Sequence, residues 1–434
     1  MFLAVATQLP ASFSISSSSI FRSPTTPQTD YFEHIFATKT KYWDQRHANS
    51  SDRTPLRQEL ELIQTQIVAR HGIRYPTGGN IQDINALLER LQPFGRLLPE
   101  WVVNYTLPYN MSVKGELAVA GEKELRKLGR RSLARSGHEA PVTYEKETYR
   151  VAHTHVSRTR DSAIAFAGEF FANAKEVKYI EYPKDKDTLL RFFDQCARYQ
   201  REVKQNITAQ EQMNDFRKSS RMAENAKWLK RALGLEGENI DFSAKDLTAV
   251  QSACAFDIAL YHHKHQWCSL LSKDLLQSVE YLDDLKEFYW IGGGYKINYE
   301  MAAVLLREIF DTMLARIQDD TSLIGNFFFA HAETTLPLMT LLGYGDRSLL
   351  FANASLSDIA SRGFRSSILS PFAANVEFRL FKRTSNDGEY YVQILVNEKE
   401  DIIPGCGRVF CKLSQLEKQW HYYLKTYSFH EDCM

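Results

Sequence analysis

Residues 61–77 read ELIQTQIVARHGIRYPT, and this stretch decides the fold. Residues 61–69 have the pattern of a strand whose end, Ile67 to Ala69, is a buried apolar run. Arg70-His71-Gly72 follows this strand directly. In open α/β sheets, ligands bind beyond the carboxyl ends of the strands. The triplet therefore lies where a functional site is expected.

Strand and helix patterns alternate at both ends of the chain, and a helical block lies between them. The other predicted strands are 148–156, 324–330, 374–382 and 389–397. The helical patterns of the two ends are 115–135, 159–174 and 334–342. Long helical patterns dominate from about residue 185 to 318, for example at 210–233, 245–262 and 299–317. We therefore expect an α/β core, residues 31–184 and 319–434, with an α-helical insertion at 185–318, after a signal-like or disordered segment at 1–30.

The charge balance narrows the class of ligand. The 53 Lys and Arg residues equal the 53 Asp and Glu residues, so the net charge is zero. A general nucleic-acid binder needs a basic surface, so no nucleic-acid partner is expected. A neutral protein can still hold an anion in a locally basic site. No stretch approaches the ~20 apolar residues of a membrane span, so none is expected.

Arg70-His71-Gly72-Ile73-Arg74 contains the residue types that phosphoryl transfer through a covalent intermediate requires. An unprotonated imidazole is a nucleophile, and the two arginines offer planar sets of N–H donors that match phosphate oxygens. Gly72 allows close approach of the backbone. The alternative is a surface loop that carries Arg, His and Arg without a chemical role.

A second motif, His331-Ala332-Glu333, follows the predicted strand 324–330. It is therefore expected at the same sheet edge as Arg70-His71-Gly72. A carboxyl group beside a bound anion keeps its proton more readily, so Glu333 can protonate the leaving alcohol. The alternative for Glu333 is an ordinary acid at a helix N-terminus.

These motifs resemble those of a known family. Arg70-His71-Gly72-x-Arg74-x-Pro76 is similar to the RHGxRxP signature of the histidine acid phosphatases, also called the branch-2 histidine phosphatases. Other segments resemble the multiple inositol polyphosphate phosphatases in particular: FFFAHAETTLPLMTLLGY at 327–344, ATKTKYW at 37–43, YYVQILVNEK at 390–399 and the PGC…C element at 404–411. The resemblance implies a phosphoglycerate mutase-like α/β core with an inserted α-helical domain. One departure is Ile73, where the family often has Thr.

The resemblance also implies roles for individual residues. They are His71 as nucleophile, Glu333 as proton donor, His331 as a second phosphate contact, and Arg70 and Arg74 as phosphate-binding residues. A further phosphate-binding arginine is expected just before the 159–174 helix. Counting back from Phe166 favours Arg158, with Arg160 as the fallback. The mechanism needs no metal and no organic cofactor.

The expected function is that of a phosphoric monoester hydrolase. Its expected substrates are inositol hexakisphosphate and lower inositol polyphosphates, with 2,3-bisphosphoglycerate as a further candidate. The alternatives are a generic histidine acid phosphatase, a phosphoglycerate mutase-like transferase and a non-catalytic inositol-phosphate binding protein. The clustered arginines should lower the pKa of His71, because a like charge disfavours imidazolium, and so predict acid-tolerant activity.

Several features favour the secretory pathway, either the endoplasmic reticulum lumen or the exterior. Glycosylation sequons occur at Asn49, Asn104, Asn110, Asn206 and Asn353. The six cysteines permit disulfides. Cys254 with Cys268 and Cys406 with Cys411 bracket short segments, whereas Cys196 and Cys433 have no evident partners. Six free thiols in a cytosolic enzyme are the alternative.

One weaker feature is the basic segment 122–135, EKELRKLGRRSLAR. It could line the approach path of an anionic ligand. A solvated amphipathic helix face is the interpretation that we favour.

Overall fold

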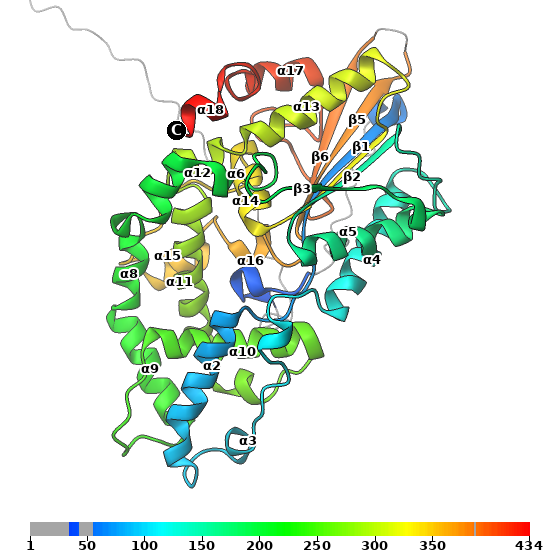
Figure 1. Cartoon of the computed structure of the whole chain (residues 1–434). Helices are drawn as coiled ribbons and strands as arrows, with labels where there is room; N and C mark the ends of the chain where they lie inside the picture. The colour runs from blue at the N-terminus through cyan, green and yellow to red at the C-terminus, as the bar shows by residue number, and fades with distance from the viewer. Residues whose placement is uncertain (1–33, 43–54, 386–387) are drawn as a thin grey trace, which may run out of the picture.

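The computed structural model describes residues 34–42, 55–385 and 388–434. Within these residues the core contains an eight-stranded mixed sheet in the order β3-β2-β4-β1-β5-β6-β7, with β8 paired to β6 (Figure 1). The strands are β1 (Leu60–Arg70), β2 (Tyr149–Thr154), β3 (Tyr179–Tyr182), β4 (Gly325–Ala330), β5 (Asn375–Arg383), β6 (Tyr390–Val396), β7 (Lys399–Glu400) and β8 (Phe410–Lys412). The predicted α/β class is thus confirmed.

The three strands that carry the sequence motifs are neighbours and run parallel. In the pairing of β1 with β4, Arg70 lies opposite Ala330, and in that of β2 with β4, His153 lies opposite Phe329. The carboxyl ends of β1, β4 and β2 therefore meet at one edge of the sheet. The residues one or two positions after each of these strands therefore lie close together at that edge.

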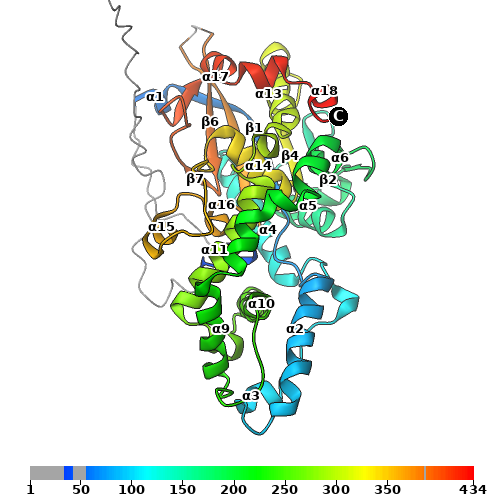
Figure 2. The same ribbon diagram turned by 90° about the vertical axis from the view of Figure 1, so that its left-hand side faces the viewer.

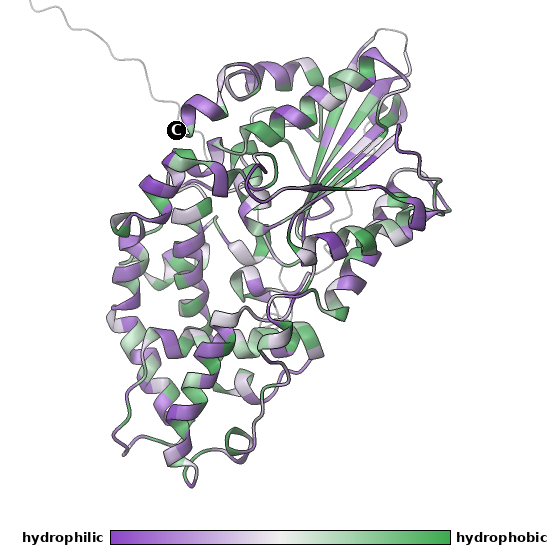
Figure 3. Cartoon of the chain, in the orientation of Figure 1, coloured by the Kyte–Doolittle hydropathy of each residue, from purple (hydrophilic) through white to green (hydrophobic). Residues whose placement is uncertain are grey.

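Side-chain alternation along β1 explains why both faces of the sheet are covered. Ile67 and Ala69 pack in one apolar cluster with Phe166, whereas Val68 packs in another with Leu336. The first cluster lies under α4 (Val119–Arg135) and α5 (Ser157–Phe170). The second lies under α13 (Ala303–Gln318) and α14 (Ala332–Leu342). Figure 3 shows hydrophobic residues gathered along the central strands, as expected for a sheet buried on both faces.

A helical part extends away from the sheet (Figures 1 and 2). It contains α8 (Glu211–Arg217), α9 (Ser220–Ala232), α10 (Ala244–Tyr261) and α11 (Lys273–Ile291), whereas α12 (Lys296–Glu300) packs against α14 of the core. Helices α2 (Gly78–Leu91) and α3 (Glu100–Val103) also lie here, and α2 packs against α10. The predicted helix 210–233 is two helices, because Ser219 accepts a hydrogen bond from the backbone N–H of Met222 and begins α9.

The remaining helices are short. They are α1 (Pro55–Gln58), α6 (Phe192–Gln195), α7 (Ala197–Tyr199), α15 (Leu356–Ser361), α16 (Ser366–Leu369), α17 (Leu413–Gln419) and α18 (Phe429–Asp432). Among the described residues, none of the helices combines the length and the apolar character that crossing a bilayer would require.

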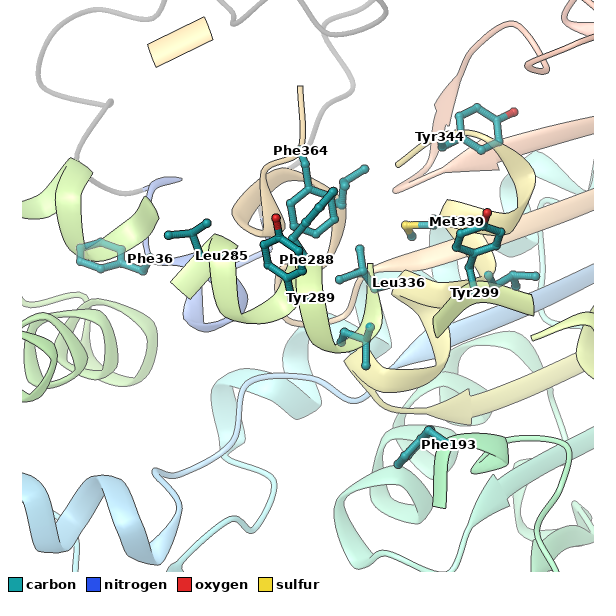
Figure 4. Close-up of a cluster of buried hydrophobic side chains, with 14 of the residues drawn as sticks. Phe36, Phe193, Leu285, Phe288, Tyr289, Tyr299, Leu336, Met339, Tyr344 and Phe364 are labelled. Carbon is teal, nitrogen blue, oxygen red and sulfur yellow. The ribbon is translucent and has the colours of Figure 1, made fainter. Parts of the chain in front are cut away.

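An apolar cluster joins the helical part to the core (Figure 4). It includes Phe288 and Tyr289 of α11, Leu336 and Met339 of α14, and Phe364, all of them nearly inaccessible to solvent. Because α14 is packed between β1 and α11, its first residues are held at a fixed place above the sheet edge.

Three disulfides tie the chain together. Cys254–Cys268 and Cys406–Cys411 form as the short spacings predict. Cys196 and Cys433, which the sequence leaves without partners, are bonded to each other across 237 residues of chain. This third bond fixes the end of the chain beside α6.

Candidate active site

The two sequence motifs meet at the carboxyl ends of β1 and β4. The backbone N–H of His71 donates to the carbonyl of Ala330 at 3.0 Å, so the parallel pairing continues into both motifs. The imidazole rings of His71 and His331 have centroids 5.7 Å apart. Two histidines separated by 260 positions in the sequence thus face the same small volume.

The His71 ring has a defined tautomer. Its Nδ1 lies 2.9 Å from the carbonyl oxygen of Gly72. A carbonyl oxygen only accepts hydrogen bonds, so Nδ1 carries the proton and Nε2 keeps its lone pair. Burial, followed by the charges of Arg70 and Arg158, holds the pKa of His71 well below its usual value. An unprotonated Nε2 in a mildly acidic medium is what a nucleophile requires.

The turn that carries His71 is held from beneath by α4 and α5. The N–H of Gly72 donates to Ser162 Oγ at 3.2 Å, and the N–H of Ile73 donates to Glu124 Oε2 at 2.9 Å. A Cβ on Gly72 would lie 2.4 Å from the carbonyl oxygen of Gly121, so only glycine permits this close contact with α4. Burial raises the pKa of Glu124 to about 7.

Three guanidinium groups surround the His71 ring without carboxylate partners. Burial lowers the pKa of Arg70 to about 10 and that of Arg74 to about 9, and it also lowers that of Arg158. Within residues 34–42, 55–385 and 388–434, none of the three forms an ion pair, and the Nε atoms of Arg70 and Arg158 are buried without a hydrogen-bond partner. Holding unpaired cations out of water is unfavourable, which is typical of a site whose partner is an anionic ligand.

Arg70 and Arg74 are held in place by neutral groups. Arg70 donates to the carbonyl oxygens of Thr38 and Ser370, both at 2.7 Å, and its Cζ lies 4.8 Å from the ring centre of Phe372. Arg74 donates to the carbonyl of Tyr75 at 2.9 Å. These contacts orient the guanidinium groups and leave their charge available.

The structure distinguishes the two candidate arginines after β2. Arg158, in the first turn of α5, places NH2 3.4 Å from Nδ1 of His331. Arg160 is exposed and pairs with its neighbour Asp161 at 3.2 Å. Arg158 therefore belongs to the cluster, and Arg160 lies outside it.

His331 and Glu333 open α14. His331 is the N-cap residue in extended conformation, and burial, with Arg158 next in importance, holds its pKa well below the usual value. Glu333 is solvent-exposed in the first helical turn. Burial is the main cause of the lowered pKa values of Arg70 and Arg158, and the negative charge of Glu333 raises both values in part. Glu333 therefore lies close to the anion site.

Sequence patterns missed Arg191 and Glu124. Arg191 approaches His331 from the residue before α6, in a segment without recognisable motif or period. Glu124 lies in the charged pattern of α4, where nothing distinguishes it from the solvated residues around it.

The arginines of the basic segment 122–135 are engaged elsewhere. Arg131 pairs with Glu398 at 2.5 Å, and Arg135 pairs with Glu377 and Glu398 at 2.6 Å each. The end of α4 thus binds Glu377 of β5 and Glu398, which follows β6. The charges of Arg131 and Arg135 are neutralised there and are not available to an approaching anion.

Comparisons with known proteins agree with this geometry. The sequence profile of the histidine phosphatase superfamily (branch 2) matches residues 61–397. Multiple inositol polyphosphate phosphatase 1 of Gallus gallus is 30% identical over 394 residues, which is 86% of this chain and 84% of the relative. The Homo sapiens protein of the same name is 29% identical, over 87% of this chain and 84% of the relative.

Two solved structures share the fold. The Bifidobacterium longum multiple inositol polyphosphate phosphatase, in complex with inositol hexasulfate, has a TM-score of 0.69 at 17% identity, covering 88% of this chain and 97% of that one. The phytase of D. castellii has a TM-score of 0.75 at 17% identity, covering 96% of this chain and 92% of that one. At this identity the likeness establishes the fold alone.

Proposed function

This chain belongs to branch 2 of the histidine phosphatase superfamily and, within it, to the multiple inositol polyphosphate phosphatases; from this membership we propose that it hydrolyses inositol hexakisphosphate and lower inositol polyphosphates through a phosphohistidine at His71. Membership makes it a phosphatase. The observation that best supports the finer proposal is the unprotonated Nε2 of His71 beside three guanidinium groups without carboxylate partners, of which Arg70 is buried and Arg74 and Arg158 are partly buried.

The first step is transfer of the phosphoryl group to the enzyme. Nε2 of His71 attacks phosphorus, the bond between phosphorus and the ester oxygen that links it to the inositol ring breaks, and the electron pair of that bond goes to the leaving oxygen. Glu333 donates its proton to this oxygen, so a neutral alcohol departs. Arg70, Arg74 and Arg158 stabilise the charge on the equatorial oxygens.

The second step returns the enzyme to its starting state. The ionised Glu333 takes a proton from water, and the water oxygen attacks the phosphorus of phosphohistidine. The N–P bond breaks, His71 recovers its lone pair, and inorganic phosphate leaves. One carboxylate therefore acts as acid and then as base.

The charge of the site supports a strongly anionic substrate. A phosphate group carries about −1.5 to −2 charges near neutral pH, so three guanidinium groups more than neutralise one such group. The names of the chicken and human relatives support inositol polyphosphates as the substrate class. The glycerate substrate 2,3-bisphosphoglycerate is the second candidate, because it presents the same phosphate monoesters on a smaller skeleton.

A direct assay separates these functions. Inorganic phosphate release is measured with inositol hexakisphosphate, a lower inositol phosphate and 2,3-bisphosphoglycerate, for the wild type, for His71→Ala and for His138→Ala. His138 is an exposed histidine beside the starts of β1 and β4, whereas both motifs follow the ends of these strands. We expect release from the inositol phosphates, loss of it only in His71→Ala, and retained substrate binding in that variant.

Two results would overturn the proposal. Equal turnover by His71→Ala and the wild type would remove His71 from the mechanism. Transfer of the phosphoryl group to a second glycerate molecule, with little release of inorganic phosphate, would favour a phosphoglycerate mutase-like transferase.

The three disulfides support a location in the secretory pathway, where the compartment is oxidising. The sequon residues Asn104, Asn110, Asn206 and Asn353 are exposed, which is compatible with glycosylation. Asn49 and the signal-like segment 1–30 lie outside the described residues. Secretion of the full chain from eukaryotic cells, with a mass shift after glycosidase treatment, is the expected result. Retention in the cytosol with free thiols would contradict it.

The domain boundaries at residues 184 and 318 stay a prediction.

A further inference from the structure

Arg191 makes a contact with His331 that the reaction described above does not use. Its NH1 lies 2.9 Å from Nε2 of His331. The rest of the guanidinium is engaged with one carboxylate: Nε donates to Oδ2 of Asp194 at 2.8 Å, and NH2 donates to the same oxygen. Lys204 lies 3.7 Å from the other oxygen of Asp194. Arg191 is thus oriented by a neighbour and directs one N–H group toward His331.

The segment that carries Arg191 is attached to the start of α14. The hydroxyl of Thr334 donates to the carbonyl of Leu190 at 2.6 Å, and the N–H of Leu190 donates to Asp187 at 2.7 Å. Thr334 is three residues beyond His331, so these contacts fix Arg191 relative to the imidazole. The approach of NH1 to Nε2 therefore has a structural cause on both sides.

The chemistry of the two groups assigns the proton of His331. A guanidinium only donates hydrogen bonds, so Nε2 of His331 must accept from Arg191. Burial, followed by the charges of Arg158, Arg191, Arg70 and His155, keeps the ring neutral by lowering its pKa. A neutral imidazole with a lone pair on Nε2 carries its proton on Nδ1.

This proton faces the anion site. Nδ1 of His331 lies 3.4 Å from NH2 of Arg158, and both are donors, so they cannot bond each other. Two N–H donors at this separation can share one acceptor between them. We propose that Arg191 is a positioning residue that fixes the Nδ1–H tautomer of His331, so that His331 and Arg158 donate together to one oxygen of the transferred phosphoryl group. This inference rests on the proposed phosphatase reaction.

The opposite tautomer has a specific alternative partner. Nε2 also lies 3.0 Å from the hydroxyl of Thr154, so an Nε2–H group could donate there and leave Nδ1 to accept from Arg158. In that arrangement His331 would have no proton for the substrate. Arg191 disfavours it, because the Nε2–H group would face a cation at 2.9 Å.

The kinetic test is a double-mutant cycle of Arg191→Gln and His331→Ala on inositol hexakisphosphate. Hydrogen-bond partners that orient metal-binding histidines typically contribute about 10–100-fold, and by analogy Arg191→Gln should lower kcat by about that factor and change KM less. In the His331→Ala background the same change should have almost no further effect. Arg198→Gln is the control, since Arg198 is an exposed arginine of the same region that pairs with Glu202, and it should leave kcat unchanged. Independent, multiplying losses in the cycle would overturn the proposal.

A spectroscopic readout is independent of turnover. In protein labelled with ¹⁵N-histidine, the wild-type His331 should show a protonated Nδ1 and an unprotonated Nε2, and Arg191→Gln should shift the balance toward Nε2–H. Nε2–H in the wild type, or no change in the variant, would overturn the tautomer assignment even if the enzyme hydrolyses inositol phosphates. Conversely, an Nδ1–H tautomer in a protein without phosphatase activity would refute the proposed function alone.

A second variant protects the test against misfolding. Asp194→Asn keeps the Arg191 donor and weakens only its anchor, so a smaller loss of kcat and a partial tautomer shift are expected. An unchanged kcat and an unchanged His331 spectrum in this variant would count against the role of the Asp194–Arg191 pair.

Discussion

Arg74→Met should stabilise the ligand-free protein while it removes most of the activity. Arg74 holds a charge in a partly buried position, where the charges of Arg158 and Arg70 lower its pKa and only the smaller effect of Glu333 opposes them. Met fills a similar volume without charge and suits the contacts with Phe256 and Phe372, whose ring centres lie 5.9 and 6.0 Å from the guanidinium. The same substitution removes a donor that the phosphoryl oxygens need.

The size of the effect follows from the pKa of Arg74. Burial, followed by the charges of Arg158 and Arg70, lowers this pKa to about 9, from the ordinary guanidinium value above 12. At about 1.4 kcal/mol for each pKa unit, keeping the charge at neutral pH costs about 5 kcal/mol. Residual contact with water reduces this, so a gain of about 2 kcal/mol in the free energy of unfolding is expected. The penalty is present below pH 9 and fades as pH rises above it.

The assay combines urea unfolding with kinetics. Arg74→Met should have the higher unfolding midpoint without phosphate, and kcat/KM lower by about 10²–10³, the usual effect of losing one transition-state donor. Added phosphate should stabilise the wild type by about 2.7 kcal/mol at 100 times its Kd and the variant much less. Arg160→Met, which changes an exposed arginine near Arg158, should alter neither quantity. A variant that is less stable than the wild type without phosphate would refute the view of Arg74 as an unpaired, strained cation.

Three further predictions concern the acid, the nucleophile and the third disulfide. Glu333→Gln should lower kcat on inositol hexakisphosphate by about 10²–10⁴ and less on an aryl phosphate with a good leaving group; an equal loss on both substrates would exclude a proton donor. Burial and the charge of Arg70 depress the pKa of His71, so kcat/KM should stay level as pH falls through the ordinary histidine value near 6.5. The free energy of unfolding should decline in the same pH range, because His71 takes up a proton there only in the unfolded chain. An inflection of kcat/KM at about pH 6.5 would contradict this. Replacing Cys196 and Cys433 by Ser should lower the free energy of unfolding by up to about 5 kcal/mol, since the bond closes a loop of 237 residues, with kcat unchanged where the protein is folded; an unchanged urea midpoint would show that the bond does not restrain the unfolded chain.

The sequence predicted the sheet edge because its signals are local. An apolar run followed by Arg70-His71-Gly72, and another followed by His331-Ala332-Glu333, each mark a buried strand that ends at a functional turn. The rule that ligands bind beyond the carboxyl ends of parallel strands then brings the two motifs together. The structure places all six predicted site residues around this edge, and their chemical roles remain predictions.

Features that depend on long-range packing could not be predicted. The bond between Cys196 and Cys433 joins positions 237 apart, and no spacing rule covers such a pair. Arg191 reaches His331 from a segment that carries neither a motif nor a period. The helix break at Ser219 was hidden, because the apolar period continues across it.

The lowered pKa of His71 was predicted with an incomplete cause. The sequence indicates the neighbouring arginines, and these do lower the pKa. The larger cause is burial, which depends on how α4, α5 and Phe372 close over the turn and cannot be read from residue types.

Identification of the residue that accepts the phosphoryl group tests the central claim most directly. The enzyme is mixed rapidly with radiolabelled inositol hexakisphosphate, quenched in alkali, in which phosphohistidine survives, and digested for peptide mapping. Label on Nε2 of His71, formed before phosphate release and absent from His71→Ala, is the predicted result. Label on another residue, or full turnover without any labelled enzyme, would contradict the account.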